Sequence, residues 1–388
     1  MAICYSEFSM LGNSRAIHEP HNHQQEQPFD LSMFSLNGNS KKMELNMLDD
    51  KFVLDRIAIL GQMTVIYAKP NSGKTLLVLW MLIQSLKEGK INGCDVFFVN
   101  ADDHYRGLVE KLKLAEQHNF NMLCPGHLTF DSTKFMQYMR QMINDDSARG
   151  KIIILDTLKK FTNLMDKTVA TDFMRVSREY VSHGGTLILL AHVNKNRGSD
   201  GKVIAAGTSD VPDDADCVFT LDEVDSHNIG RKQVLFENIK SRGDVANELA
   251  YSYDEKKEGQ SYLGLLYSVE VLSEKDVLKL KKSNSITNLL SKNKRCIEAI
   301  VETIGMGITL KTNLLDIAHK ETGISKSKLI KVLDEHTGAL FDEGHRWKVI
   351  KGEKNAKIYE LLKPNNPNQE THPNELIQQR IKETILAH

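Results

Sequence analysis

Residues 68–75, A-K-P-N-S-G-K-T, have the types and spacing of a loop that binds phosphate. Gly73 lets the backbone approach a phosphate oxygen, Lys74 adds a positive charge, and Thr75 offers a hydroxyl to Mg²⁺. The strict pattern begins with glycine, and Ala68 stands there instead, which weakens the match without removing it. The alternative is an ordinary strand-to-helix turn. We predict phosphate contacts from Ala68, Lys69, Pro70, Asn71, Ser72, Gly73, Lys74 and Thr75.

Acidic residues follow two further apolar runs. Asp156 comes directly after I-I-I-L, where a carboxylate is costly to bury without a cation partner. We therefore expect Asp156 and Thr75 to hold a metal ion, although Asp156 could instead cap the helix that T-L-K-K begins. Asp102 follows D-V-F-F-V-N-A and could orient the water that attacks a γ-phosphate, a role for which Asp103 competes.

An α/β fold with a mostly parallel sheet is needed to bring these residues together. From Gly61 to about Val193 the sequence alternates apolar strand patterns with helical patterns. Strands are predicted from residue 63 and at 95–101, 151–155 and 186–191, and helices at 105–118, 134–144 and 172–182. Because ligands gather at the carboxyl ends of parallel strands, the loop, Asp102, Asp156 and His192 should share one crevice.

Further elements are expected on either side of this alternation. The apolar run 54–60 suits a helix under the first strand. Four short runs, at 216–221, 233–239, 248–253 and 262–267, are predicted to be antiparallel strands that complete one edge of the sheet. We assign residues 33–272 to this domain, residues 1–32 to a flexible arm, and the Lys-rich residues 273–284 to a charged linker.

Residues 285–364 are predicted to form a second, winged-helix-like domain. Helical patterns at 294–303, 311–320 and 326–336 precede a hairpin of residues 346–351 and 356–361, and residues 365–388 form a polar tail. Its expected contacts with duplex DNA are Lys326, Lys328 and Lys331 near the third helix and Arg346 and Lys348 beside the wing. Alternatively, these side chains only solvate a small domain or contact a protein.

The composition restricts the class of protein. With 41% hydrophobic and 26% charged residues among 388, and a net charge of -1, the chain is typical of a globular protein and gives no whole-chain argument for nucleic acid. The five cysteines are scattered without a C-x-x-C pair, which argues against structural zinc and a disulfide framework. No apolar run reaches the roughly 20 residues that a membrane helix needs. We expect a cytoplasmic protein without a membrane partner.

Six motifs in order resemble those of the RecA-like P-loop ATPases, in particular the plasmid and phage RepA-type hexameric replicative helicases. They are A-K-P-N-S-G-K-T-L, V-N-A-D-D-H-Y-R, I-I-I-L-D-T-L, L-L-A-H-V-N-K, G-T-S-D-V-P-D-D-A-D and N-I-K-S-R-G-D, within residues 34–270. The resemblance implies ATP and Mg²⁺ as cofactors, and Lys74 and Asp102 as catalytic residues. The family normally has Glu where Asp102 stands. It also implies that His192 senses the γ-phosphate.

The same resemblance implies a homo-oligomer, a hexameric ring. Lys240 and Arg242 match a K-x-R element that reaches the ATP site of a neighbouring subunit, where a guanidinium stabilises the charge of phosphoryl transfer. Without the resemblance they are two exposed cations in a turn. Lys195, Arg197 and Lys202 follow His192 in a basic loop that would line the pore and bind single-stranded DNA.

These observations predict an ATP-dependent DNA helicase or translocase that acts in the replication of a mobile element or phage. The alternative is an ATP-switched replication initiator, helicase loader or regulator that hydrolyses ATP without unwinding. Asp102 in place of Glu and the dedicated C-terminal domain favour that alternative. A small-molecule kinase would need a substrate-binding lid, for which the sequence gives no candidate.

Overall fold

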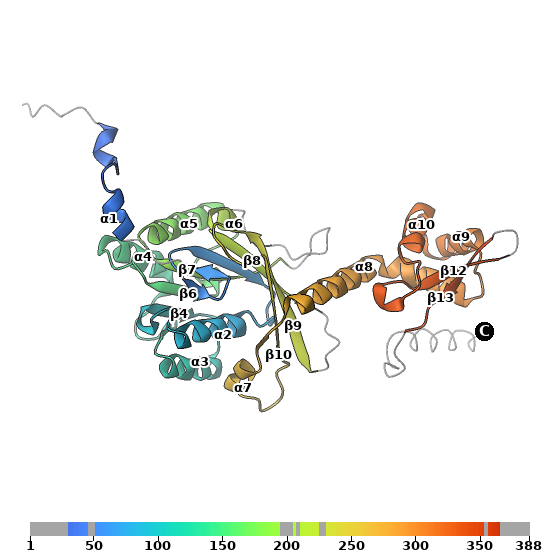
Figure 1. Cartoon of the computed structure of the whole chain (residues 1–388), viewed down its shortest axis with the longest axis horizontal. Helices are drawn as coiled ribbons and strands as arrows, with labels where there is room; N and C mark the ends of the chain where they lie inside the picture. Colours follow the sequence, from blue (N-terminus) through green and yellow to red (C-terminus); the bar gives the residue numbers. More distant parts are fainter. Residues whose placement is uncertain are drawn as a thin grey trace, which may run out of the picture. The chain divides into compact units, whose positions relative to one another are not determined.

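The computed structural model describes residues 30–45, 51–194, 205–206, 210–224, 230–352 and 356–364 (Figure 1). Residues 1–47 form a unit apart from residues 48–388. Within the first unit, a 3₁₀-helix at Leu31–Phe34 and helix α1 at Ser40–Leu45 have no buried side chain. Most of the arm predicted at 1–32, and the whole tail at 365–388, lie outside the described residues.

The second unit is built on a nine-stranded sheet of order β11-β10-β9-β8-β3-β7-β6-β4-β5. The six strands from β8 to β5 are parallel, and β9, β10 and β11 are antiparallel at one edge. The strands are β3 (Met63–Ala68), β4 (Val96–Asn100), β5 (Asn121–Leu123), β6 (Ile152–Asp156), β7 (Thr186–His192), β8 (Cys217–Val224), β9 (Arg231–Lys240), β10 (Glu248–Asp254) and β11 (Glu270–Val271).

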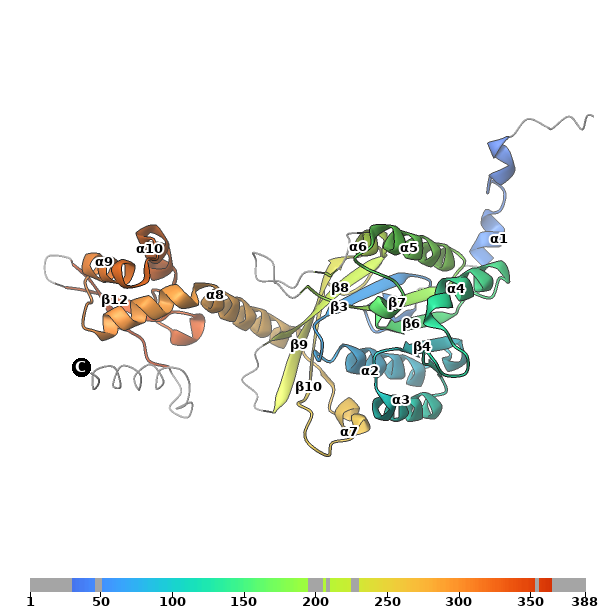
Figure 2. The same ribbon diagram turned by 180° about the vertical axis from the view of Figure 1, so that it is seen from behind.

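Helices cover both faces of this sheet. They are α2 (Lys74–Lys87), α3 (Tyr105–Gln117), α4 (Phe135–Asn144), α5 (Lys167–Ser182), α6 (Asp210–Asp214) and α7 (Tyr262–Tyr267), with 3₁₀-turns at Gly93–Asp95, Ser132–Lys134 and Leu158–Lys160. Figures 1 and 2 show α2 and α3 on one face and α4 and α5 on the other. The predicted α/β class, with a mostly parallel sheet between two helical layers, is confirmed at this level.

The core follows from the period of two in the buried strands. On β6, Ile152 and Ile154 belong to the cluster that includes side chains of α2, whereas Ile153 and Leu155 belong to the cluster that includes side chains of α4 and α5. A continuous apolar strand is therefore needed, as the I-I-I-L run predicted. Trp80 of α2 packs edge-on against Tyr251 of β10, with ring centroids 5.8 Å apart.

The strand register aligns the candidate site residues. Strand β3 lies between β7 and β8, and Ala68 at its end is paired with His192 at the end of β7. In the same way, Asn100 at the end of β4 is paired with Asp156 at the end of β6. Four candidate segments consequently reach the same carboxyl edge of the sheet.

Two predicted elements are wrong. Residues 54–60 form no helix, because Arg56 turns the chain at a φ of 51° and a two-stranded antiparallel sheet forms from β1 (Phe52–Leu54) and β2 (Ala58–Ile59). The predicted strand at 262–267 is helix α7. Its N-cap is Ser261, whose side chain accepts a hydrogen bond from the Gly264 N–H at 3.1 Å.

The charged linker predicted at 273–284 is also helical. It is the first part of α8 (Glu274–Gly305), whose N-cap Ser273 accepts from the Asp276 N–H. Capping and two acidic residues in the first turn favour helix over irregular chain. Of the helices that the structure describes, none is long and apolar enough to cross a membrane.

The C-terminal residues form three helices and a hairpin. Helices α8, α9 (Lys311–Thr322) and α10 (Lys326–Glu335) are followed by a 3₁₀-turn at Phe341–Glu343 and the antiparallel strands β12 (Trp347–Lys351) and β13 (Lys357–Leu361). Their shared core contains the fully buried Trp347, whose indole N–H donates to the Leu333 carbonyl at 2.9 Å. This order of elements is the one expected for a winged helix, an assignment that stays a prediction.

Candidate active site

The predicted phosphate loop joins the central strand β3 to helix α2. Gly73 stands at the N-terminus of α2 with a φ of 79°, and a Cβ at this position would lie 2.3 Å from the hydroxyl oxygen of Tyr253. Glycine is required here for both reasons. Ala68 ends β3 as a regular, buried strand residue, so the glycine of the strict pattern is not needed there.

The centre of the site is the carboxylate of Asp156. The Thr75 hydroxyl donates to Asp156 Oδ2 at 2.5 Å, and Lys74 Nζ lies 3.2 Å from Oδ1. The Lys74 and Asp156 side chains are only 7% and 4% exposed, so each compensates the buried charge of the other. Asp156 therefore contacts the phosphate loop, while Thr157 holds the N-cap position of the following 3₁₀-turn.

This pair of side chains fits Mg²⁺. A hydroxyl and a carboxylate are oxygen donors, which Mg²⁺ prefers, and Mg²⁺ typically binds one or two carboxylates together with substrate phosphates. Thr75 and Asp156 would hold the ion or its water ligands at the phosphate loop, where the ion would neutralise charge on the phosphates. The predicted metal site remains an inference from these donors.

Asp102 and Asp103 differ in their surroundings. Asp103 accepts a hydrogen bond from Asn100 Nδ2 at 2.7 Å and forms an ion pair with Lys111 of α3. Asp102 is 43% exposed, and Lys159 Nζ lies 4.0 Å from its Oδ1. Because Asp103 is held against α3, Asp102 is the carboxylate better placed to contact a water molecule.

A single cavity of about 780 Å³ joins these groups. Its lining includes the phosphate loop residues Lys69 to Thr75 except Ser72, and also Asp102, Asp156 and His192. The convergence predicted from the strand ends is therefore present in the structure. The roles assigned to the individual side chains stay predictions.

His192 ends β7 beside the loop. Burial lowers the pKa of its imidazole from 6.5, and the nearby Lys74 and Lys159 ammonium groups lower it further. A neutral imidazole at pH 7 can donate one hydrogen bond and accept one, so it can respond to a phosphate without carrying charge itself.

Other residues of the cavity were not predicted from the sequence. Tyr253 of β10, Tyr262 of α7 and Lys232 of β9 line it from the antiparallel edge of the sheet. The Tyr253 hydroxyl is buried beside Gly73 with no hydrogen-bond partner among the described residues, and burial raises its pKa. The sequence offered no signal, since Tyr253 alternates along β10 like Tyr251, which is a core residue.

Lys240 and Arg242 lie at the other end of the sheet. Lys240 is paired with Val218, and the adjacent Cys217 is paired with Thr64 near the start of β3, whereas the phosphate loop follows the end of β3. The length of β3, about 16 Å at 3.3 Å per residue, separates the two ends. The side chains of Lys240 and Arg242 are thus too far from the phosphate loop of their own chain to contact a phosphate bound there.

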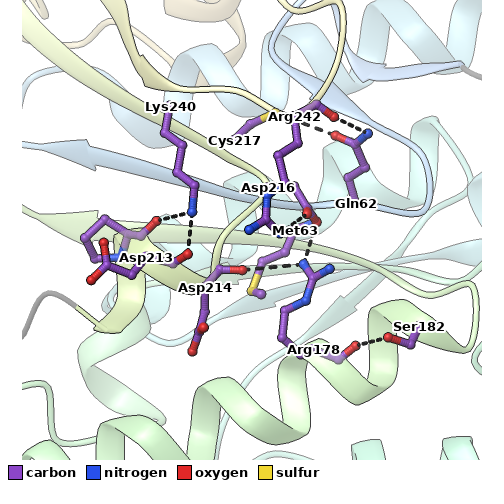
Figure 3. A network of polar contacts seen from close by, with 11 residues as sticks. Gln62, Met63, Arg178, Ser182, Asp213, Asp214, Asp216, Cys217, Lys240 and Arg242 are labelled. Carbon is purple, nitrogen blue, oxygen red and sulfur yellow. Dashed lines mark hydrogen bonds and ion pairs between the residues drawn. The ribbon is translucent and has the colours of Figure 1, made fainter.

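The side chains of the K-x-R element are held by the segment 212–216 (Figure 3). Lys240 Nζ donates to the carbonyl oxygens of Pro212, at 3.0 Å, and Asp213. Arg242 Nη1 lies 3.4 Å from Asp216 Oδ1.

The residues expected to contact DNA differ in exposure and in whether they already have a partner. Lys195, Arg197 and Lys202 lie outside the described residues. On α10, Lys328 and Lys331 are exposed, and Lys326 pairs with Asp316 at 2.5 Å.

The two expected wing residues already have protein partners. Lys348 of β12 pairs with Glu360 at 3.2 Å. The Arg346 guanidinium stacks 4.0 Å from the Phe341 ring centroid and donates to two carbonyl oxygens, so its contacts favour a structural role over the expected DNA contact.

Comparisons with known proteins give little further information. Neither the protein-family models nor the curated proteins contain a match to this chain. Among solved structures, the KaiC-like protein PH0186 from the hyperthermophilic archaeon Pyrococcus horikoshii OT3 is similar over 56% of this chain and 91% of that chain, with 13% identity and a TM-score of 0.39. A likeness at this level supports no functional argument.

Proposed function

We propose that this chain is a Mg²⁺-dependent ATP hydrolase of the RecA-like ring type. One observation carries the proposal: Lys74 and Thr75 of the phosphate loop both contact the buried Asp156, in a cavity that Asp102 and His192 also line. Backbone N–H groups at the start of α2 would bind a phosphate oxygen, and Lys74 would add a positive charge beside the β- and γ-phosphates.

The cavity also supplies the groups that hydrolysis needs. Asp102 orients the attacking water and accepts its proton, and His192 contacts the γ-phosphate or the water beside it. Tyr253 lines the cavity beside Gly73 and offers its hydroxyl as a hydrogen-bond donor. Thr75 and Asp156 would hold Mg²⁺, which would neutralise negative charge on the transferring phosphoryl group.

The position of the K-x-R element favours assembly. Because Lys240 and Arg242 lie at the end of the sheet opposite the phosphate loop, we propose that they act on the ATP of a neighbouring copy in a hexameric ring. A guanidinium delivered in this way stabilises transition-state charge and makes hydrolysis depend on assembly.

We further propose that the reaction drives a DNA helicase or translocase in the replication of a mobile element or phage. The order of the six motifs supports this, as does the three-helix and hairpin unit with Lys328 and Lys331 exposed on α10. In this proposal the unit is a winged helix that binds duplex DNA, and the basic residues after His192 bind the single strand.

An ATP-switched initiator or helicase loader is the second candidate. Asp102 favours it, because its carboxylate is one methylene shorter than the Glu usual in helicases of this type and reaches less far toward the γ-phosphate. Such a protein would hydrolyse ATP and assemble on duplex DNA without translocation.

The test is steady-state ATP hydrolysis without DNA, with single-stranded DNA and with duplex, together with strand displacement on a forked duplex. Stimulation by single strands with displacement is expected for the helicase. Stimulation or assembly on duplex without displacement would support the initiator or loader instead, and a chain that does not hydrolyse ATP under any condition would refute both.

A further inference from the structure

Asp216 is a buried carboxylate shared by two arginines at the amino-terminal edge of the sheet (Figure 3). Its side chain is 8% exposed, and it precedes β8 beside the start of β3. Oδ2 accepts the Met63 N–H at 2.9 Å and lies 2.7 Å from Arg178 Nη1 of α5, while Oδ1 lies 3.4 Å from Arg242 Nη1.

The Arg178 pair and the Met63 N–H already compensate the buried carboxylate. Burying a charge is costly unless it is paired and hydrogen-bonded, and these two contacts supply both requirements at short distance. The Arg242 contact is longer, and the Arg242 side chain is 55% exposed, so the fold gains little from it. The stability of the fold therefore does not explain why Arg242 is paired with Asp216.

Arg242 is held at both its backbone and its side chain. Gln62 Nε2 donates to the Arg242 carbonyl oxygen at 3.1 Å, and Arg242 Nη1 donates to Asp216 Oδ1 at 3.4 Å. A guanidinium has five N–H donors in a planar fork, so an arginine bound at one nitrogen keeps donors for a phosphate. Lys240 lies two residues before Arg242, at the end of β9, and its ammonium group donates to the carbonyl oxygens of Pro212 and Asp213.

We propose that Asp216, together with Gln62, positions Arg242 and fixes its guanidinium in the orientation required by the ATP site of a second copy of this chain. Arg178 and Met63 hold the carboxylate in place, and the carboxylate in turn holds Arg242. A cation oriented before the reaction costs no reorganisation when charge develops on the phosphoryl group. This inference rests on the proposed function, in which Arg242 acts between copies.

The first test is the variant Asp216→Asn. Its amide oxygen can still accept the Met63 N–H, but it cannot form an ion pair with Arg178 or with Arg242. We expect kcat for ATP to fall roughly 10-fold, a size typical of losing a group that orients another, while KM for ATP and nucleotide binding stay unchanged, because the phosphate loop lies at the other end of the sheet. Asp214→Asn is the matched control: it removes the same charge in the same segment, and only the Asp214 backbone carbonyl contacts Arg178.

Mixed assemblies distinguish positioning from damage to the fold. Asp216→Asn subunits keep an intact ATP cavity, and Asp102→Asn subunits keep an intact Arg242. A mixture should therefore recover part of the activity that each lacks alone, because the second subunit supplies a correctly held arginine to the first. A structural defect in the Asp216→Asn cavity would not be rescued.

A second variant covers the case in which Asp216→Asn fails to fold. Gln62→Ala removes the hydrogen bonds with the Arg242 carbonyl and with the Cys217 thiol and leaves the buried carboxylate paired. It should lower kcat by less than the roughly 10-fold expected for Asp216→Asn, with rescue in the same mixture. An unchanged or higher kcat in whichever variant folds, a raised KM, or an absence of rescue overturns the proposal. By contrast, an Arg242→Ala chain as active as wild type would refute the proposed action of Arg242 between copies, and this inference with it.

Discussion

Asp102 and Asp103 are adjacent in the sequence and both line the cavity, but their side chains have different partners. Lys111 and Asn100 hold Asp103, whereas Asp102 has Lys159 at 4.0 Å. The sequence predicted that one of the pair acts on water, because the pair follows a buried strand. It could not select one, because the selection depends on which carboxylate α3 retains.

Asp102→Asn should keep nucleotide binding and lower kcat by about 10²- to 10⁴-fold, the usual contribution of a positioned base. Asp103→Asn is the matched change, expected to lower kcat far less and to reduce stability through the lost Lys111 pair. Nucleotide titrations and single-turnover hydrolysis would measure both. Equal losses of kcat in the two variants would contradict the assignment.

His192 should make stability depend on pH. Its pKa in the folded chain is lowered from 6.5, so the unfolded chain binds the proton more readily. The free energy of unfolding that depends on the neutral imidazole is therefore fully present above pH 6.5, and is lost as pH falls through 6.5 toward the lower folded value.

Urea unfolding of wild type and His192→Asn at pH 7.5 and pH 5.5 measures this effect. The unfolding free energy of wild type minus that of His192→Asn should be smaller at pH 5.5 than at pH 7.5, because only wild type loses the contribution of the neutral imidazole. A difference that grows at pH 5.5 would show that the folded chain favours the imidazolium.

At the scale of elements, side-chain capping explains two of the three predictions that failed, the strand at 262–267 and the linker at 273–284. The residues Y-L-G-L-L-Y have the composition of a strand, but the Ser261 side chain caps them as α7. The same holds for α8, which Ser273 begins inside the Lys-rich stretch assigned to a linker. By contrast, the strands that carry Asp156 and His192 were predictable, because strands buried on both faces are continuously apolar.

Ser273→Ala should lower the free energy of unfolding by roughly 0.5–2 kcal/mol, because the first turn of α8 loses its side-chain cap. Ser285→Ala is the control, since Ser285 is exposed within α8 and alanine there should be neutral or slightly stabilising. Chemical denaturation followed by far-UV circular dichroism compares the two. Equal stability of the two variants would show that the cap contributes nothing.

At the scale of the whole molecule, positive charge is concentrated in particular segments and is not visible in the net charge. The chain has a net charge of -1, but lysines gather on exposed positions of α10. This distribution was readable from the sequence. The partners of the lysines were not, because the pairing of Lys326 with Asp316 and of Lys348 with Glu360 depends on the packing of α9 and the register of the hairpin.

Replacing Lys326, Lys328 and Lys331 with alanine should weaken binding to duplex DNA and reduce the slope of log affinity against log salt by up to about 3, roughly 0.9 per lost phosphate contact. ATP hydrolysis without DNA should not change. Fluorescence anisotropy at several salt concentrations measures the slope, and replacement of the exposed Lys87, Lys113 and Lys167 serves as the control. An unchanged slope in the α10 variant would assign this unit to protein binding.

The packing of the two tryptophans gives the chain a pair of optical reporters. Trp80 lies on the helix that starts at the phosphate loop and contacts Tyr251, while Trp347 lies in the core of the C-terminal unit. The chain has no other tryptophan. Emission from a Trp347→Phe protein would therefore follow nucleotide binding and unfolding of the sheet domain alone, and emission from a Trp80→Phe protein would follow the C-terminal unit.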